Sequence, residues 1–190
     1  MKTAAIVLAA GASRRLGEPK QLIRLSGETL VERAVRVCRE AGCDPVVVVL
    51  GASAKQIRKQ CSFEDAKILV NEEWPEGMGS SLRAGVTALA EDVDGCAVVT
   101  CDMPAISMEH LRELMKTGEK TASTYAGRRG VPAFFPRSSF AQLIELRGDT
   151  GARELLRDAP TVELKGGEID VDTVDDLARV RELFGRTSSA

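Results

Sequence analysis

Apolar runs of strand length alternate along the first half of this chain with segments in which apolar residues recur at helical spacing. Four runs are predicted as strands, at residues 4–10, 45–50, 66–70 and 96–101. Three segments with helical spacing are predicted as helices, at residues 29–41, 79–90 and 108–115. This alternation is typical of repeated β-α-β units, so it predicts an α/β fold built on a mostly parallel sheet.

The pattern of the second half is less regular. It predicts strands at residues 121–125 and 131–135, with residues 127–130 as the hairpin turn between them. It also predicts helices at residues 138–146, 151–157 and 174–184, and a short strand at 162–164. We find neither an internal repeat nor a linker, so we expect a single domain over residues 1–185 and a polar tail over residues 186–190.

The chain has 190 residues, and a chain of this length buries roughly 70% of its extended surface, enough for one sheet covered on both faces. Its cysteines form no C-x-x-C pair, so neither a zinc site nor a redox motif is indicated. We interpret them as the reduced thiols of a cytoplasmic protein. They are Cys38, Cys43, Cys61, Cys96 and Cys101.

The net charge is −2, with basic and acidic residues interspersed, which argues against nucleic acid or an anionic membrane as the main partner. The apolar start at residues 3–10 is too short for a signal peptide or a membrane span. We therefore expect a soluble protein of the cytoplasm.

The most informative segment is residues 8–20, which leaves the first predicted strand through small residues and carries two arginines and a lysine. Gly11 and Gly17 let main-chain N–H groups approach anionic oxygens closely, while Arg15 and Lys20 supply positive charge. The segment therefore indicates a nucleotide polyphosphate as ligand. The alternative is a surface turn whose basic residues are simply solvated.

Two better-known phosphate loops do not match this segment. A P-loop would need a second glycine where Leu16 stands, and Ser or Thr in place of Gln21. The spacing of Gly11 and Gly17 does not supply the G-x-G-x-x-G fingerprint of dinucleotide-binding folds.

Acidic residues follow two of the predicted buried segments. Asp102 comes where the strand at 96–101 ends, and ligands of open α/β sheets bind beyond the carboxyl ends of the strands, so we expect Asp102 to face the same crevice as the segment after the first strand. A carboxylate beside a triphosphate can hold Mg²⁺. Asp170 and Asp172 offer a second acid on one side of an extended segment, although Asp172 or Thr173 could instead cap the helix that follows.

The sequence offers no histidine-based catalytic relay. His110 is the only histidine, and we interpret it as a surface residue because its neighbours are charged. Transfer of a nucleotidyl group to a phosphate acceptor needs no such base, because a phosphate monoester has its second pKa near ~6 and is already largely dianionic. Catalysis then reduces to alignment and stabilisation of charge on the departing pyrophosphate.

Six short motifs occur in order between residues 8 and 173. They are Leu8-Ala9-Ala10-Gly11-x-Ser13-x-Arg15-x-Gly17-x-x-Lys20, Gly77-Met78-Gly79-Ser80-Ser81-Leu82, Cys101-Asp102-Met103-Pro104, Gly130-Val131-Pro132-Ala133-x-Phe135, Gly148-Asp149-x-Gly151-Ala152-Arg153 and Asp170-Val171-Asp172-Thr173. In this combination the chain resembles the molybdenum cofactor nucleotidyltransferases, and most closely their cytidylyltransferase branch. The resemblance implies a Rossmann-like three-layer sandwich of the nucleotidyltransferase type that encloses a nucleotide and an acceptor phosphate.

The resemblance also implies roles for individual residues. Arg15, Lys20 and Asp102 would be catalytic, and Asp102 with Asp172 would bind Mg²⁺, Asp170 being the other candidate for the second metal ligand. The remaining implied nucleotide contacts are to the triphosphate, to the base and to the nucleoside pocket. Gly11, Ser13, Arg15 and Lys20 would hold the triphosphate. Ala9 and Ala10 would lie near the base, and Ser80 and Ser81 would contribute to the nucleoside pocket.

The substrates follow from the same resemblance. The opening Ala9-Ala10-Gly11 resembles that of CTP users, so we expect CTP and the phosphate of molybdopterin cofactor as substrates. We also expect transient contact with a molybdenum hydroxylase apoenzyme. One departure concerns the acceptor, because Val131 stands where many relatives have histidine. The alternatives are the guanylyl reaction, transfer to a sugar phosphate or other small phosphorylated acceptor, and a nucleotide-binding protein that delivers the cofactor without turnover.

Overall fold

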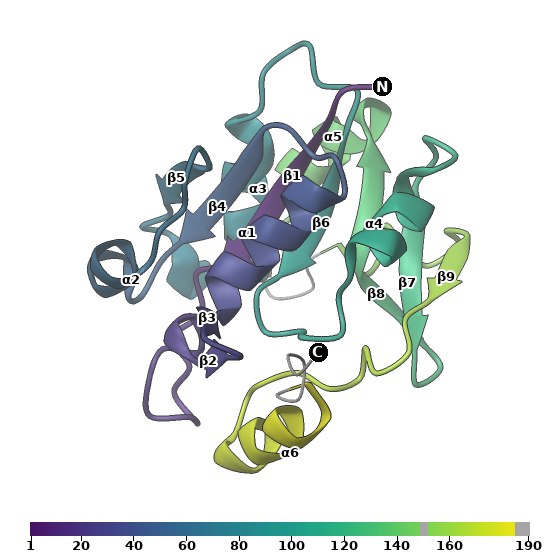
Figure 1. Cartoon of the computed structure of the whole chain (residues 1–190). Coiled ribbons are helices and arrows are strands. Elements are labelled where there is room, and N and C mark those ends of the chain that lie inside the picture. Colours follow the sequence, from purple (N-terminus) through teal and green to yellow (C-terminus); the bar gives the residue numbers. More distant parts are fainter. Residues whose placement is uncertain (149–151, 185–190) are drawn as a thin grey trace.

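The computed structural model describes residues 1–148 and 152–184, and its centre is a seven-stranded sheet (Figure 1). The sheet has the strand order β5-β4-β1-β6-β8-β7-β9. Only β8 runs antiparallel to its neighbours among these strands, so the predicted mostly parallel α/β sheet is confirmed. The strands are β1 (Thr3–Ala9), β4 (Val46–Leu50), β5 (Lys67–Val70), β6 (Gly95–Thr100), β7 (Thr121–Tyr125), β8 (Arg128–Pro136) and β9 (Thr161–Glu163).

Helices cover both faces of the sheet, which is why β1 is apolar and buried along its whole length. Alternate residues of β1 point to opposite faces. Ala5 and Val7 pack on the side of α1 (Leu30–Glu40) and α4 (Met108–Met115). Ile6 and Leu8 pack on the side of α3 (Met78–Thr87) and α5 (Phe140–Ile144). The predicted three layers therefore follow from two distinct apolar clusters, one on each face.

A third apolar cluster lies beyond the carboxyl ends of the parallel strands. It joins residues of the segment after β1, the short hairpin β2 (Arg24–Leu25) and β3 (Glu28–Thr29), and α6 (Val174–Phe184). Figure 1 shows the hairpin and α6 at this end of the sheet. The cluster holds the segment after β1 and the segment before α6 close together.

Local signals explain the helix ends that the sequence predicted well. The hydroxyl of Thr29 accepts a hydrogen bond from the backbone N–H of Glu32, whose carboxylate accepts in turn from the backbone of Thr29. At the other end Gly42 has φ of 97° and follows the C-cap residue Ala41, so α1 ends at Glu40, one residue before the predicted end.

The structure contains several short elements that the sequence did not predict. Helix α2 (Ala54–Gln60) buries only Ala54 and Ile57, so it is too short and too polar to show a helical period. The hairpin β2–β3 has two residues in each strand. The single-turn 3₁₀ helices are η1 (Lys20–Leu22), η2 (Trp74–Glu76) and η3 (Arg137–Ser139), and η3 takes the start of the helix predicted at 138–146.

The turn between β7 and β8 is shorter than predicted. Tyr125 pairs with Arg128, so only Ala126 and Gly127 form the turn, with φ of 46° and 70°. Arg128 and Arg129 therefore belong to β8 rather than to the turn. This correction matters because it places both side chains on a strand that borders a cavity.

Two of the elements predicted near the end of the chain are confirmed. Strand β9 and helix α6 form where they were expected, β9 one residue earlier. The helix predicted at 151–157 begins outside the described residues, and residues 152–158 form successive turns. The tail at 186–190 also lies outside the described residues. Within the described residues no helix is long and apolar enough to cross a membrane.

Candidate active site

The segment after β1 is shaped by a buried side chain. The amide of Gln21 donates to the carbonyl oxygens of Ala9 (2.8 Å) and Gly11 (3.0 Å), which fixes the turn from strand to loop. Ser13 has φ of 52°, and its hydroxyl accepts from the backbone N–H of Lys20 at 3.0 Å. Ser13 thus closes the loop on Lys20. The sequence reading missed Gln21, whose only signal is a polar residue next to the loop lysine.

Lys20 brings together three distant segments. Its Nζ lies 2.5 Å from Oδ2 of Asp102, just after β6, and 2.8 Å from Oδ1 of Asp172, just before α6. Arg15 approaches the other oxygen of Asp172 at 2.5 Å. The backbone N–H of Val171 donates to the carbonyl oxygen of Asp102, which joins the two acidic segments. The predicted residues Arg15, Lys20, Asp102 and Asp172 therefore meet at one place.

Ion pairing fixes the charge states in this group. Burial by itself would lower the pKa of Lys20, but Asp102 and Asp172 outweigh it and hold the pKa above its ordinary value. Burial would raise the pKa of Asp172, yet hydrogen bonds and charges from Lys20 and Arg15 lower it. Asp170 behaves differently, because burial and the neighbouring carboxylates of Asp102 and Asp172 raise its pKa.

The donor set fits a divalent cation that arrives with a nucleotide. Oδ1 of Asp102 is buried and has no hydrogen-bond partner in the described part of the chain, so it is a free hard-oxygen ligand. The described residues contain no group of three or more metal-ligating side chains. Mg²⁺ typically takes one or two carboxylates and completes its shell with substrate phosphates and water. Asp102 and Asp172 supply that number.

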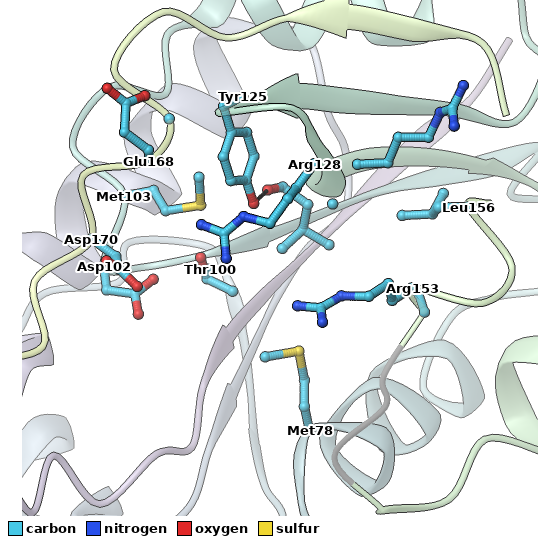
Figure 2. A pocket seen from close by; sticks show the side chains of 15 residues that line it. Met78, Thr100, Asp102, Met103, Tyr125, Arg128, Arg153, Leu156, Glu168 and Asp170 are labelled. Atoms are coloured by element: carbon cyan, nitrogen blue, oxygen red, sulfur yellow. Dashed lines mark hydrogen bonds between the residues drawn. The ribbon is translucent and has the colours of Figure 1, made fainter. Parts of the chain in front are cut away.

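Two hollows meet at Asp102. The loop cavity, of about 220 Å³, is bordered by Ala10, Gly11, Lys20 and Ser81. The hairpin cavity, of about 260 Å³, extends on the other side toward the β7–β8 hairpin (Figure 2). Both are bordered by Met78, Thr100 and Asp102. Asp102 therefore stands between two spaces, each of a size for part of a small ligand.

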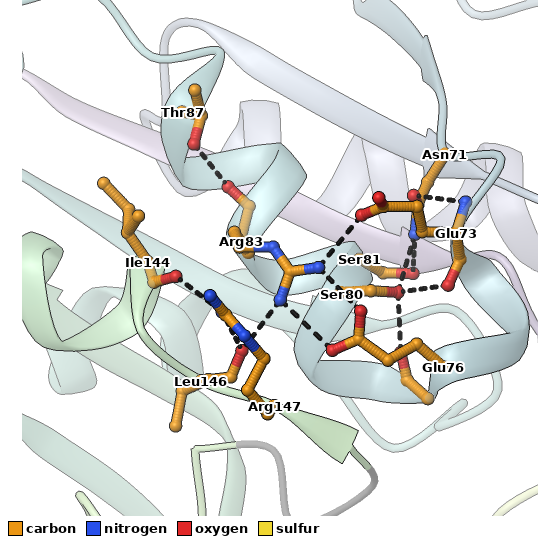
Figure 3. A network of polar contacts seen from close by, with 11 residues as sticks. Asn71, Glu73, Glu76, Ser80, Ser81, Arg83, Thr87, Ile144, Leu146 and Arg147 are labelled. Carbon is orange, nitrogen blue, oxygen red and sulfur yellow. Dashed lines mark hydrogen bonds and ion pairs between the residues drawn. The ribbon is translucent and has the colours of Figure 1, made fainter.

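The residues predicted near the nucleoside divide into two kinds. Ala10 and Ser81 border the loop cavity, whereas Ala9 is buried in the core. Ser80 is turned away from that cavity, since its hydroxyl accepts from Nδ2 of Asn71 and donates toward the carbonyl oxygens of Glu73 and Gly77 (Figure 3). Ser80 therefore positions the start of α3.

Asn71 and Arg83 also hold the start of α3 in place, and the sequence analysis predicted a role for neither residue. Asn71 lies at the end of β5 and donates to both Ser80 (2.9 Å) and Ser81 (3.1 Å). Arg83 binds Glu73 and Glu76 and donates to the carbonyl oxygen of Leu146 (Figure 3). The start of α3 is thus tied both to β5 and to the chain after α5.

A close backbone approach explains two of the glycine-containing motifs. A Cβ atom on Gly79 would lie 2.8 Å from the carbonyl oxygen of Gly148, a distance that side chains do not tolerate. The motif that begins at Gly77 therefore packs directly against the motif that begins at Gly148.

The interpretation of His110 as a surface residue is wrong. The side chain is 9% exposed, and its Nε2 lies 2.7 Å from Oγ of Ser123, which itself donates to the carbonyl oxygen of Pro132. Since the Ser123 proton is directed at Pro132, the ring donates to Ser123 and does not act on it as a base. The pair is structural, and the expectation of chemistry without a histidine base is unaffected.

The family described as MobA-like NTP transferase domain matches residues 5–164 of the chain. The chain is 36% identical to the nicotine blue oxidoreductase of Paenarthrobacter nicotinovorans, over 92% of this chain and 94% of that protein. It is 36% identical to a probable molybdenum cofactor guanylyltransferase of Opitutus terrae, over 81% and 76%. The molybdenum cofactor cytidylyltransferase of Escherichia coli is 23% identical, over 94% and 95%.

Solved structures agree with the fold. Rv0371c of Mycobacterium tuberculosis superposes with a TM-score of 0.85 at 29% identity and covers 96% of this chain and 98% of its own. The same mycobacterial protein is known in complex with manganese, with a TM-score of 0.80 over 96% of this chain and 100% of its own. Nucleotidyltransferases of this kind use a divalent metal ion.

Proposed function

The chain belongs to the family of MobA-like NTP transferase domains, and from this premise we propose that it transfers CMP from CTP to the phosphate of molybdopterin cofactor with release of pyrophosphate. We further propose that the reaction depends on Mg²⁺. The observation that carries the proposal is the contact of Lys20 with Asp102 at the border of two cavities. One cavity is assigned to the nucleotide and the other to the acceptor.

The loop residues bind and orient the triphosphate in this proposal. Gly11 presents backbone to the loop cavity, Ser13 closes the loop, and Lys20 with Arg15 supplies positive charge. Their charges stabilise the negative charge that develops on the departing pyrophosphate. Asp102 and Asp172 would hold Mg²⁺, and the ion would further neutralise the charge of the phosphate oxygens.

The acceptor needs no base. Its phosphate is already largely dianionic at neutral pH, so the protein has only to bring it in line with the α-phosphorus. Thr100 and Asp102 border both cavities and lie where the two substrates would meet. The absence of a catalytic relay from the described site therefore agrees with the proposed reaction.

Transfer of GMP from GTP is the second candidate. It is favoured by the 36% identity to the probable guanylyltransferase of Opitutus terrae, whereas CTP is favoured by the Ala9-Ala10-Gly11 opening and by the Escherichia coli relative. The acceptor is the other open choice, because Val131 borders the hairpin cavity and offers no polar side chain to a pterin.

A pyrophosphate-release assay with CTP, GTP, ATP and UTP, in the presence of molybdopterin cofactor and Mg²⁺, tests the proposal. We expect release to be fastest with CTP and to disappear in Asp102→Asn. Preference for GTP would replace the cytidylyl assignment by the guanylyl one. Cofactor delivery to an apoenzyme that survives in Asp102→Asn would favour the non-catalytic role.

The relative named as an oxidoreductase calls for one control. Because the chain lacks the G-x-G-x-x-G fingerprint, we expect no reduction of nicotine blue with NADH or NADPH. Reduction faster than pyrophosphate release would contradict the proposed function.

A further inference from the structure

Three arginines border the hairpin cavity, and none of them has a carboxylate partner among the residues that the structure describes. Arg129 follows Arg128 on β8, so its side chain points to the opposite face of the strand. Arg128 comes from the start of β8 and Arg153 from the turns at 152–158, and both border the cavity. Figure 2 shows both guanidinium groups pointing into it. Neither makes a hydrogen bond or ion pair with any residue that the structure describes, whereas Arg36 and Arg83 each bind two carboxylates.

The carboxylates of this cavity lie on its other side. Glu168 and Asp170 border it from the segment before Asp172, across from Arg153 in Figure 2. Tyr125 borders the same cavity, and the pKa of its hydroxyl is raised, chiefly by burial. The charges of Asp170 and Asp102 raise this pKa further, whereas those of Arg128 and Arg153 oppose them. An anionic ligand group is therefore attracted to the arginine side and repelled from the other.

Arg153 belongs to the motif at residues 148–153, for which the proposed reaction has no role. The beginning of this motif is fixed by the close packing of Gly148 on Gly79 and by the bond of Arg83 to the carbonyl oxygen of Leu146. Arg128 is fixed by its pairing with Tyr125 across the tight turn. Arg153 itself is held by its neighbours Ala152 and Leu156, which are both buried in the apolar cluster on the α3 side of the sheet. Two anchored segments thus present guanidinium groups to one space.

We propose that Arg128 and Arg153 bind the phosphate monoester of the acceptor substrate. A guanidinium donates two parallel hydrogen bonds to phosphate oxygens, and two such groups suit a dianion. The neighbouring wall includes Val131, Leu156 and Met103, which suits an apolar or flat body attached to the phosphate. The acceptor class is thus a small organic phosphate monoester whose phosphate lies between the guanidinium groups of Arg128 and Arg153.

The identification of the bound phosphate monoester as the acceptor substrate rests on the proposed function. The binding site itself does not depend on the identity of the nucleotide base or of the pterin. The arginines border the hairpin cavity and not the loop cavity, which separates them from Lys20 and Gly11. They are therefore assigned to the acceptor and not to the triphosphate of the nucleotide.

The experiment compares Arg128→Gln and Arg153→Gln with wild type. Arg157→Gln is the matched control, because Arg157 is exposed in the same run of turns and does not border the cavity. The probe is phenyl phosphate, titrated by calorimetry into protein saturated with Mg²⁺ and α,β-methylene CTP, which cannot transfer CMP. Melting temperatures establish that each variant is folded.

We expect the Kd for phenyl phosphate to rise about tenfold or more in each arginine variant, because each loses a charged pair of hydrogen bonds. The Kd for the CTP analogue should change less than about twofold in the same variants, and Arg157→Gln should match wild type. Arg128→Lys and Arg153→Lys should fall between wild type and the glutamine variants, since lysine keeps the charge without the fork.

Three outcomes would overturn the inference. They are wild-type protein that does not bind phenyl phosphate, an unchanged Kd in both glutamine variants, and an equal loss of affinity for the CTP analogue. If wild type binds phenyl phosphate through the arginines but shows no pyrophosphate release with molybdopterin, the inference stands and the proposed function fails. With molybdopterin turnover, the same variants should raise the acceptor KM while leaving that of CTP unchanged.

Discussion

The ammonium of Lys20 lies 2.5 Å from a carboxylate oxygen of Asp102, across 82 residues of sequence. Lys20 comes from the segment after β1, and Asp102 follows β6, the strand that pairs with β1. The contact joins the positively charged loop to the acid that ends a buried strand. Because Asp172 shares the same ammonium, the lysine holds two carboxylates together.

Replacement of Lys20 by methionine removes the charge and keeps an unbranched side chain that is one atom shorter. We expect kcat/KM for CTP to fall about 10²-fold or more, because the charge acts most strongly on the departing pyrophosphate. Steady-state pyrophosphate release measures this, with Lys165→Met as an exposed control. A loss below about tenfold would place Lys20 outside the reacting groups.

The same variant tests competition between the lysine and a metal ion. In the wild type each of the two carboxylates already binds Lys20, and Asp172 also binds Arg15, so we expect weak binding of Mn²⁺ without nucleotide. Lys20→Met frees one charge-assisted bond to each carboxylate, and we expect Mn²⁺ affinity to rise about tenfold. Electron paramagnetic resonance of free Mn²⁺ gives both constants. Equal Mn²⁺ affinities in the wild type and in Lys20→Met would show that the ammonium group does not compete with the metal ion for the carboxylates.

Ser80 and Ser81 should respond differently to removal of the hydroxyl. Ser80→Ala leaves the amide of Asn71 with one partner fewer and frees the carbonyl oxygens of Glu73 and Gly77, so we expect a loss of about 1–3 kcal/mol in the free energy of unfolding. Ser81 borders the loop cavity, so Ser81→Ala should raise the KM for CTP more than Ser80→Ala does. Urea unfolding and steady-state kinetics of both variants measure this. A reversed pattern would contradict the assignment of Ser80 to support and Ser81 to the cavity.

His110 makes stability depend on pH. Burial lowers the pKa of its ring in the folded protein, whereas the unfolded chain takes up the proton near pH ~6.5. Below that pH the unfolded state binds more protons, so stability is full above about pH 6.5 and falls as the pH decreases. His110→Gln should lack this part of the dependence, as measured by urea unfolding at pH 7.5, 6.5 and 5.5. The same slope in both proteins would show that the ring is not held neutral.

Much of the fold could be predicted because its signals are local. The continuous apolar run of β1 and the amphipathic repeat of α1 are read directly from neighbouring residues, and each implies its layer. The expectation that Asp102 faces the loop also needed only the rule that parallel strands end at one edge. By contrast, α2 carries too few apolar residues to show a period.

What the sequence did not predict depends on tertiary contacts. Gln21 and Asn71 are polar residues whose importance comes from what folds around them. His110 shares a helix face with Leu111 and Leu114, although its charged neighbours suggested exposure. The adjacent serines Ser80 and Ser81 differ because successive helical residues point about 100° apart. No local pattern distinguishes such cases.

The central claim is that the loop after β1 and the acid after β6 bind one nucleotide together with one divalent ion. A crystal structure of the protein with α,β-methylene CTP and Mg²⁺ tests it most directly. The account predicts the triphosphate against Gly11, Arg15 and Lys20, with the ion bound to Asp102 and Asp172. A nucleotide that lies away from the loop, or an ion that contacts neither aspartate, would contradict it.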